Sequence, residues 1–207
     1  MKKSIISIVV LCVALFSANT SFAQTARWGV TVGADMTSMV FDQDLFSVSK
    51  NVGGTVGVTG ELMMPGIGFG FEAGVMYTQR GAKLNLGEKP IWATQGFGKE
   101  NCALHYIEIP IHLKFKYNRL NGFENTLMPM VFVGPEFSFL VAKNDIAAFN
   151  YPAGEFGLDL GVGAEIMRKV QVAASYTLGL SYSVKDKYLT DFIGQNRTWK
   201  LTCTYFF

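Results

Sequence analysis

The side chains with the most obvious chemical potential are two histidines and a scattered set of carboxylates. His105 and His112 flank Glu108, and these residue types are common ligands of a metal ion. Paired carboxylates could perform acid–base catalysis or conduct ions, and a serine such as Ser138 beside His112 could form a nucleophilic pair. Each of these chemistries requires the side chains to share one face at contact distance. The elements that hold the residues therefore decide between the alternatives.

Apolar and polar residues alternate with a period of two in eight segments, each about ten residues long, as in strands with two unlike faces. None of the residues on the apolar faces is charged. After Ala23 no stretch approaches 18 consecutive apolar residues, which excludes helical membrane spans. The sequence therefore predicts an all-β, eight-stranded antiparallel barrel with strands over residues 28–36, 56–64, 67–78, 107–117, 131–141, 156–166, 171–181 and 198–207.

Alternation alone fits both a soluble barrel with its apolar face inside and an outer-membrane barrel with that face against lipid. The polar face is rich in glycine and small residues, which suits the crowded interior of eight strands, whereas the large apolar side chains are too many for it. We therefore expect a transmembrane β-barrel with a side-chain-filled lumen. Aromatic residues near the segment ends, typical of an interfacial girdle, are Trp28, Tyr77, Tyr117, Tyr182, Trp199 and Phe207.

The connections between the predicted strands alternate in length, as periplasmic turns and extracellular loops do in such barrels. Short connections lie at residues 65–66, 118–125 and 167–169, and longer ones lie near residues 37–53, 81–103, 142–153 and 183–196. Both termini then fall on the periplasmic side. Cys102 is expected at the outer rim and Cys203 near the inner one, so we expect two free thiols.

Residues 1–23 are predicted to be a signal peptide, with Lys2 and Lys3 before an apolar run and small residues before Gln24. Residues 24–207 then form one outer-membrane barrel domain in the cell outer membrane. Without the two leader lysines, basic and acidic residues are equal in number, which argues against a nucleic-acid partner. Only 16% of the whole sequence is charged, against about 25% in an average soluble domain.

Two stretches resemble a known family. Residues 105–117, HYIEIPIHLKFKY, followed by residues 133–139, VGPEFSF, resemble the centre of the PorT-like outer-membrane β-barrel domain of Bacteroidetes-type bacteria. The last twelve residues, NRTWKLTCTYFF, are similar to that family's final strand, and the terminal Phe207 resembles the signal read by the barrel assembly machinery. The resemblance implies fold and compartment but no reaction. Pro110 and Pro135 lie inside predicted strands, where bulges are expected to accommodate them.

Strand parity then orders the candidate site residues. His112 and Glu108 face the lumen but His105 faces outward, and residues four apart on a strand are about 13 Å apart, so no metal site is expected. Ser138 could pair with His112 across strands, although filling space is the better account of a serine there. The lumen charges are expected to form a salt-bridge network, because buried charges persist only when paired. They are Asp35, Glu61, Glu72, Glu108, Glu136, Glu155, Asp159 and Glu165, opposed by Arg80, Lys114, Lys116 and Lys200.

These patterns predict a non-enzymatic outer-membrane barrel without catalytic, cofactor-binding or metal-binding residues. Its role would be structural or interaction-forming, with lipid around the wall and a protein or surface partner at the extracellular loops. The longest loop, Ala82 to Cys102, carries Ile91, Trp92 and Phe97, which could contact a ligand or simply cap the barrel. The alternatives are a lipid-modifying enzyme, a narrow channel or solute-binding barrel, and an accessory factor of a secretion apparatus.

Overall fold

The fold is taken from a computed structural model of the 207-residue chain. The residues that it describes are 25–41, 47–64, 66–85, 99–117, 126–143, 149–150, 152–181, 184–186 and 193–207. The predicted signal peptide, Tyr182 and the loop residues Ile91, Trp92 and Phe97 lie outside them. No helix of the described part is long and apolar enough to cross a membrane.

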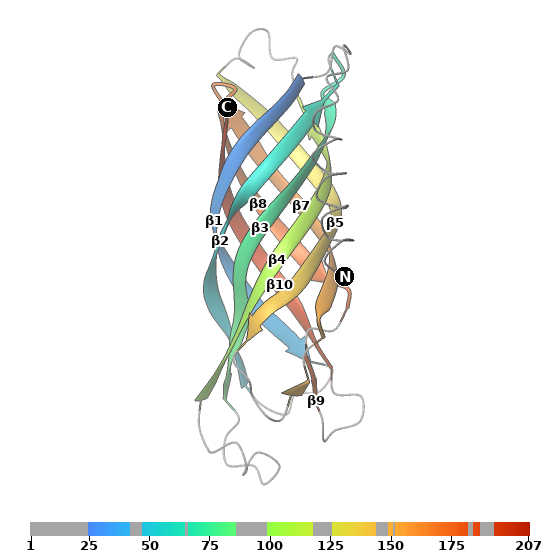
Figure 1. Cartoon of the computed structure of the whole chain (residues 1–207). Helices are drawn as coiled ribbons and strands as arrows, with labels where there is room; N and C mark the ends of the chain where they lie inside the picture. The colour runs from blue at the N-terminus through green and yellow to red at the C-terminus, as the bar shows by residue number, and fades with distance from the viewer. Residues whose placement is uncertain are drawn as a thin grey trace.

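Eight long strands form the wall. Each is tilted across the barrel (Figure 1). They are β1 (Thr25–Phe41), β2 (Ser47–Met63), β3 (Phe69–Asn85), β4 (Lys99–Lys116), β5 (Leu127–Lys143), β7 (Gly154–Ile166), β8 (Val170–Gly179) and β10 (Ile193–Phe206). Two short strands, β6 (Phe149–Asn150) and β9 (Val184–Asp186), extend the sheet beside β10.

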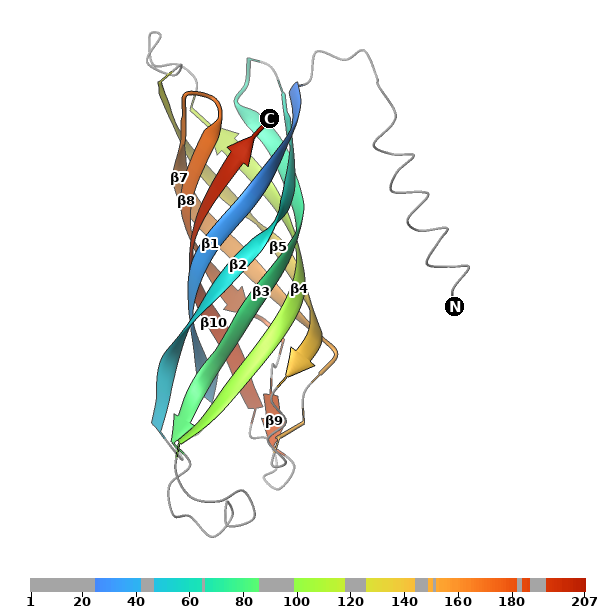
Figure 2. The same ribbon diagram turned by 60° about the vertical axis from the view of Figure 1, so that its left-hand side comes forward.

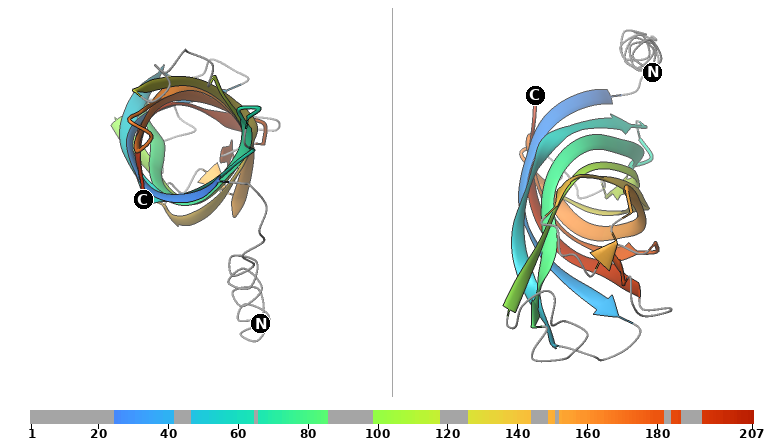
Figure 3. Two further views of the ribbon diagram at one scale, coloured as in Figure 1. Left: turned by 90° about the horizontal axis from the view of Figure 1, so that it is seen from above. Right: turned by 60° about the horizontal axis from the view of Figure 1, so that its bottom comes forward.

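The sheet closes on itself. Every neighbouring pair of long strands is antiparallel, and β1 pairs with β10 from Gly29 opposite Phe206 to Phe41 opposite Gly194. Viewed along its axis, the described part is a ring of strands (Figure 3). Because the last strand pairs with the first, the ring of eight long strands has no free edge, and the predicted eight-stranded antiparallel barrel is confirmed.

The two faces of the wall differ as predicted. Along β1, Thr31 is 1% exposed and its neighbour Val32 is 51% exposed, and the same alternation runs through all eight long strands. Most large apolar side chains therefore point outward, and mainly polar or small ones point inward. Confining the apolar side chains to the outside inverts the arrangement of a water-soluble protein.

The strands are longer than their apolar pattern. β1 to β5 each span 17 or 18 residues, and they extend into segments that were predicted as loops, so that β3 ends at Asn85 and β4 begins at Lys99. The sequence of these extensions includes polar residues such as Lys83, Asn85 and Asn101. The hydrophobic alternation stops before the hydrogen-bonded ladder does, and pattern alone places the strand ends too early.

The bulges predicted at Pro110 and Pro135 are wrong. Pairing between β3 and β4 and between β4 and β5 is interrupted for two residue pairs near each proline, but the register is the same on both sides of each gap. A missing N–H therefore removes hydrogen bonds without inserting a residue. The register shifts lie elsewhere, between Lys50 and Thr55 and between His105 and Tyr106.

Thr25, Phe206 and the described tight turns lie at one end of the barrel, which Figure 2 shows at the top. β2 and β3 are joined by a turn with positive φ at Gly66 and Gly68, and β7 and β8 by Met167–Lys169. We call this the turn end and the opposite one the loop end. The register places Cys102 opposite Ala82 toward the loop end, and Cys203 is a free cysteine on the outer face.

Candidate functional site: the ion-paired lumen

The lumen collects the chain's buried charges. All twelve charged residues predicted to face inward are at most 7% exposed, and Arg27, half-buried at the turn end, joins them. Hydroxyl groups fill much of the remaining lumen wall, with bonded pairs such as Thr31–Thr59 at 2.8 Å and Thr37–Thr198 at 2.9 Å. The charges form two clusters along the barrel axis.

The turn-end cluster links five strands, β1, β2, β3, β4 and β7. Arg27 of β1 binds Glu61 and Glu165 through Nη2 at 2.5 Å each, and Lys116 of β4 binds the same two carboxylates, Glu61 at 2.6 Å. Lys114 lies 3.2 Å from Glu61 and also pairs with Glu72. Because β1, β4 and β7 are not neighbours in the sheet, these ion pairs cross the lumen.

Aromatic packing completes this end of the barrel. The guanidinium of Arg27 lies 4.4 Å from the centroid of the Phe206 ring, and Lys116 Nζ lies 5.6 Å from the same centroid. Phe206 is 2% exposed, whereas the adjacent Phe207 is 80% exposed. The two terminal phenylalanines therefore have different roles, one packing inside the lumen and one outside the wall.

His112 is held between two carboxylates on the loop-end side of the turn-end cluster. Its Nδ1 lies 3.4 Å from Glu72 Oε1 and its Nε2 lies 3.2 Å from Asp159 Oδ2. The ring also packs against Phe132, with centroids 4.8 Å apart, and Asp159 accepts a 2.9 Å hydrogen bond from Thr177. Counting His112 as a cation, the turn-end half of the lumen matches four carboxylates with four basic groups.

The loop-end cluster is a square of two cations and two carboxylates. Lys200 Nζ lies 2.8 Å from Glu108 and 2.6 Å from Glu136, while Arg80 lies 2.5 Å from Glu108 and also pairs with Glu136. The four residues come from β3, β4, β5 and β10, so the square also spans the lumen. Breaking one partner of such a buried arrangement leaves an uncompensated charge.

Two further carboxylates at the loop end contact neutral groups. Asp35 is 2% exposed and accepts a long 3.4 Å hydrogen bond from Thr55, although Lys200 is its cross-strand neighbour. Glu155 accepts hydrogen bonds from the Tyr106 hydroxyl and, at 3.0 Å, from the Asn196 amide. The described loop-end half of the lumen therefore contains four carboxylates and two cations.

The structure separates residues that looked like a site in the sequence. His105 faces outward, where its Nδ1 lies 2.8 Å from the Tyr77 hydroxyl, while His112 faces inward. Glu108 belongs to the loop-end square, and His112 contacts Glu72 and Asp159 rather than Ser138. Within the described residues, no group of three or more His, Cys, Asp or Glu side chains could hold a metal ion.

Several lumen residues were missed by sequence reasoning. Arg27 precedes the first predicted strand by one residue, and extending the parity of that strand backward would have placed it inward. Phe132 and Tyr106 are inward-facing aromatic residues, and Phe132 lies in an unbroken apolar run between Val131 and Val133. The apolar run hides the alternation at Phe132 itself, and only the parity of the predicted strand over residues 131–141 places it inward.

Comparison with known proteins agrees with this architecture. Residues 22–185 match the family described as outer membrane protein beta-barrel domain. The chain is 12% identical to the outer membrane protein OprG from Pseudomonas aeruginosa, covering 89% of this chain and 95% of that one with a TM-score of 0.51. No curated protein matches the sequence significantly.

Two other solved structures are more distant in shape. Ail, the attachment invasion locus protein of Yersinia pestis, is 14% identical over 88% of this chain and 99% of its own, with a TM-score of 0.45. The outer membrane enzyme PagL is 10% identical over 83% and 98%, with a TM-score of 0.46. The family match covers most of the sequence, including seven of the eight wall strands in full. The protein therefore belongs to the outer membrane protein β-barrel domain family and resides in the cell outer membrane.

Proposed function

We propose that this protein is a non-enzymatic outer-membrane barrel whose rigid wall presents its loop-end segments to a partner outside the cell. The observation that carries the proposal is the pair of ion clusters that cross the lumen, because each connects strands on different sides of the barrel. They stabilise the wall and occupy the space that a substrate or a stream of ions would need. The surface that remains for binding a partner is then the loop end.

The contacts of His112 weigh against a hydrolytic role in lipid modification. A general base needs a free imidazole nitrogen within reach of the nucleophile's proton. Both nitrogens of His112 lie close to carboxylate oxygens, Nδ1 at 3.4 Å from Glu72 and Nε2 at 3.2 Å from Asp159, so neither nitrogen faces a nucleophile. His105, which faces outward, uses Nδ1 for the Tyr77 hydroxyl.

Planar-bilayer recordings of the refolded protein test the closed lumen. We expect no steady conductance from the unaltered protein. Steady, ion-selective conductance that Glu108→Ala abolishes would instead establish a channel. Lipid profiles of deletion and complemented cells test the enzymatic alternative, since a difference that reverts only with an intact His112 would establish lipid modification.

The partner at the loop end is tested by cross-linking on intact cells. Replacing residues 86–98 by a short Gly-Ser linker is expected to remove the cross-linked species, whereas the same replacement of residues 144–148 serves as a matched control. Equal cross-linking by all three proteins would overturn a loop-end partner at residues 86–98. A secretion component among the partners would support the accessory role implied by the PorT-like motifs.

Insertion is proposed to use the barrel assembly machinery through the final strand. Phe207 directly follows that strand and is 80% exposed, and its ring lies 5.3 Å from that of Tyr205 in an edge-on arrangement. Phe207→Ser is expected to lower the amount of barrel in outer membranes without changing refolding in detergent. Phe206→Ser, the neighbouring inward residue, is expected to impair refolding as well, because it removes the ring that packs on Arg27.

A further inference from the structure

A shallow trough of about 510 Å³ runs along the outer face of the wall, from β3 through β4, β5, β7 and β8 to β10. Its lining is almost entirely apolar. Because this face is continuous with the membrane-facing wall of an outer-membrane protein, lipid is the medium that meets it.

The floor of the trough follows one row of cross-strand partners. Phe132 of β5 pairs with Gly161 of β7, and Gly161 pairs with Ser175 of β8, all three facing the lumen. The outward residues on either side of this row form the two rims of the trough. One rim is lower at Ala174, because the side chain of alanine is short. A methyl group at that position leaves the backbone of the floor open from outside.

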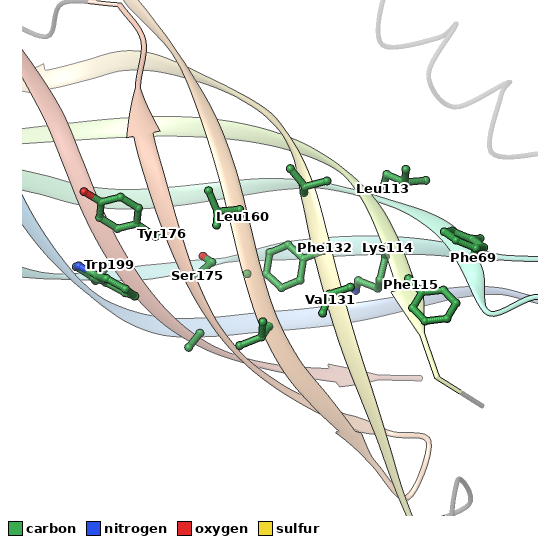
Figure 4. A pocket seen from close by; sticks show the side chains of 14 residues that line it. Phe69, Leu113, Lys114, Phe115, Val131, Phe132, Leu160, Ser175, Tyr176 and Trp199 are labelled. Carbon is green, nitrogen blue, oxygen red and sulfur yellow. The ribbon is translucent and has the colours of Figure 1, made fainter. Parts of the chain in front are cut away.

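Two aromatic pairs close the ends of the trough. Tyr176 and Trp199 lie at one end with ring centroids 4.7 Å apart, and Phe69 and Phe115 lie at the other, also 4.7 Å apart. Figure 4 shows the pairs at opposite ends of the band of lining side chains, with Leu160 between them. The Phe69 end adjoins the described turn at Gly66–Gly68, which places it at the turn end of the barrel.

The dimensions match one leaflet of a bilayer. Six strands at a spacing of about 4.8 Å give the trough a length of about 24 Å. A row perpendicular to strands tilted by roughly 35–45° then rises by about 15 Å along the barrel axis. That rise is about half of a hydrocarbon core of about 30 Å.

We propose that this trough binds one acyl chain of a glycerophospholipid from the leaflet at the turn end. The chain lies between the two rims, over the backbone near Gly161 and Ala174, and the aromatic pairs limit its sliding in either direction. Short turns face the periplasm in barrels of this class, so the lipid is one of the periplasmic leaflet. The trough differs from the rest of the wall because it holds a single acyl chain at a fixed place.

Quenching of Trp199 fluorescence by phospholipids with brominated acyl chains tests the proposal. The full-length mature barrel carries Trp28→Phe and Trp92→Phe, so that Trp199 is its one remaining tryptophan. It is held in amphipol, and the brominated phospholipid is titrated in. We expect quenching to saturate at one lipid per barrel. Ala174→Phe, which fills the trough, is expected to raise the half-saturating concentration at least tenfold.

Ala34→Phe is the matched control, since Ala34 is an exposed, outward-facing alanine of β1 outside the lining. It should leave the saturation unchanged. Val162→Phe narrows the same trough and provides a second variant should Ala174→Phe fail to show the gel shift of a folded barrel. Quenching that rises without saturation, or saturation that survives both trough variants, would overturn the proposal. Native mass spectrometry should detect one retained phospholipid, and a dimer without lipid would show that a second copy covers the trough.

Discussion

His112 and Asp159 meet across an intervening strand, with Nε2 of the imidazole 3.2 Å from Oδ2 of the carboxylate. His112 is on β4 and Asp159 is on β7, and between them lies Gly134 of β5, the direct cross-strand partner of Asp159. With only a hydrogen at this position, the imidazole passes over β5. The glycine of the VGPEFSF motif therefore leaves the space that this ion pair needs, although it takes no part in the pair itself.

The first prediction concerns this glycine. A Cβ at position 134 would lie 1.9 Å from the carbonyl oxygen of Ile111 and 2.9 Å from the Cα of His112, so β4 and β5 would have to separate. We expect Gly134→Ala to lower the free energy of unfolding by about 2–3 kcal/mol, as overpacking does elsewhere. Urea titrations of refolded protein in lipid vesicles measure it.

Gly54→Ala is the matched control for that experiment. Gly54 is also a strand glycine, but a Cβ there would meet nothing closer than 3.7 Å. Its effect should stay within about 0.5 kcal/mol. If both variants lower the free energy of unfolding equally, the loss comes from replacing a flexible glycine backbone. It does not then come from the close approach of β4 and β5.

A second prediction separates the carboxylates of the loop-end half. Glu136→Gln removes one corner of the square and leaves Lys200 and Arg80 sharing a single carboxylate, which should cost about 3–5 kcal/mol. Asp35→Asn removes a buried charge whose described hydrogen bond is to Thr55, and we expect it to be neutral or to stabilise the barrel by about 1 kcal/mol.

The same urea titration compares the two variants, with the tryptophan emission maximum as the signal. A loss for Asp35→Asn as large as that for Glu136→Gln would contradict the charge imbalance at the loop end. Ser138→Ala, a buried substitution in β5 that removes no charge, serves as the reference for mutating this part of the lumen.

Much of the barrel was predictable because each of its strands must present one face to lipid. Val30 and Val32 can only face outward if Thr31 faces inward, and the same constraint acts on all eight strands. The lumen charges followed from the same parity. Strand parity did not predict which charges pair with each other. Lys200 binds Glu108 of β4, 92 positions earlier in the sequence, and not its cross-strand neighbour Asp35.

Partner choice depends on the tilt and closure of the barrel, which no local pattern encodes. Arg27 and Glu165 illustrate the same point, since they are 138 positions apart and come together through Nη2 and Oε2 only when β1 closes the ring. Pro110 misled the prediction for a different reason. A barrel strand can lack the hydrogen bonds to its neighbour over two residue pairs and keep the same register on both sides of the interruption.

A third prediction concerns the turn between β7 and β8. Met167 and Arg168 have φ values of 50° and 58°, a left-handed backbone that Asn and Gly adopt more readily. Replacing the pair by Asn-Gly should stabilise the barrel by about 1–2 kcal/mol. The carbonyl that receives Arg27 belongs to the backbone of residue 168 and is retained. Met167→Leu, which keeps a side chain ill-suited to this φ, should give no gain in the same measurement.

The last prediction tests which medium surrounds the wall. Val162 is 60% exposed and Val52 is 70% exposed, so in water Val→Arg would be harmless at both positions. In a membrane the two sites differ in depth. Val162 lies between Val131 and Ala174 in the apolar part of the wall, whereas Val52 follows the polar residues Lys50 and Asn51 toward the loop end. We expect Val162→Arg to cost about 2–4 kcal/mol and Val52→Arg at most about 1 kcal/mol, measured by urea unfolding from lipid vesicles. Exposed fraction alone predicts no large effect at either site, because both side chains are more than half exposed. Equally small effects at the two sites would therefore mean that water and not lipid covers this wall.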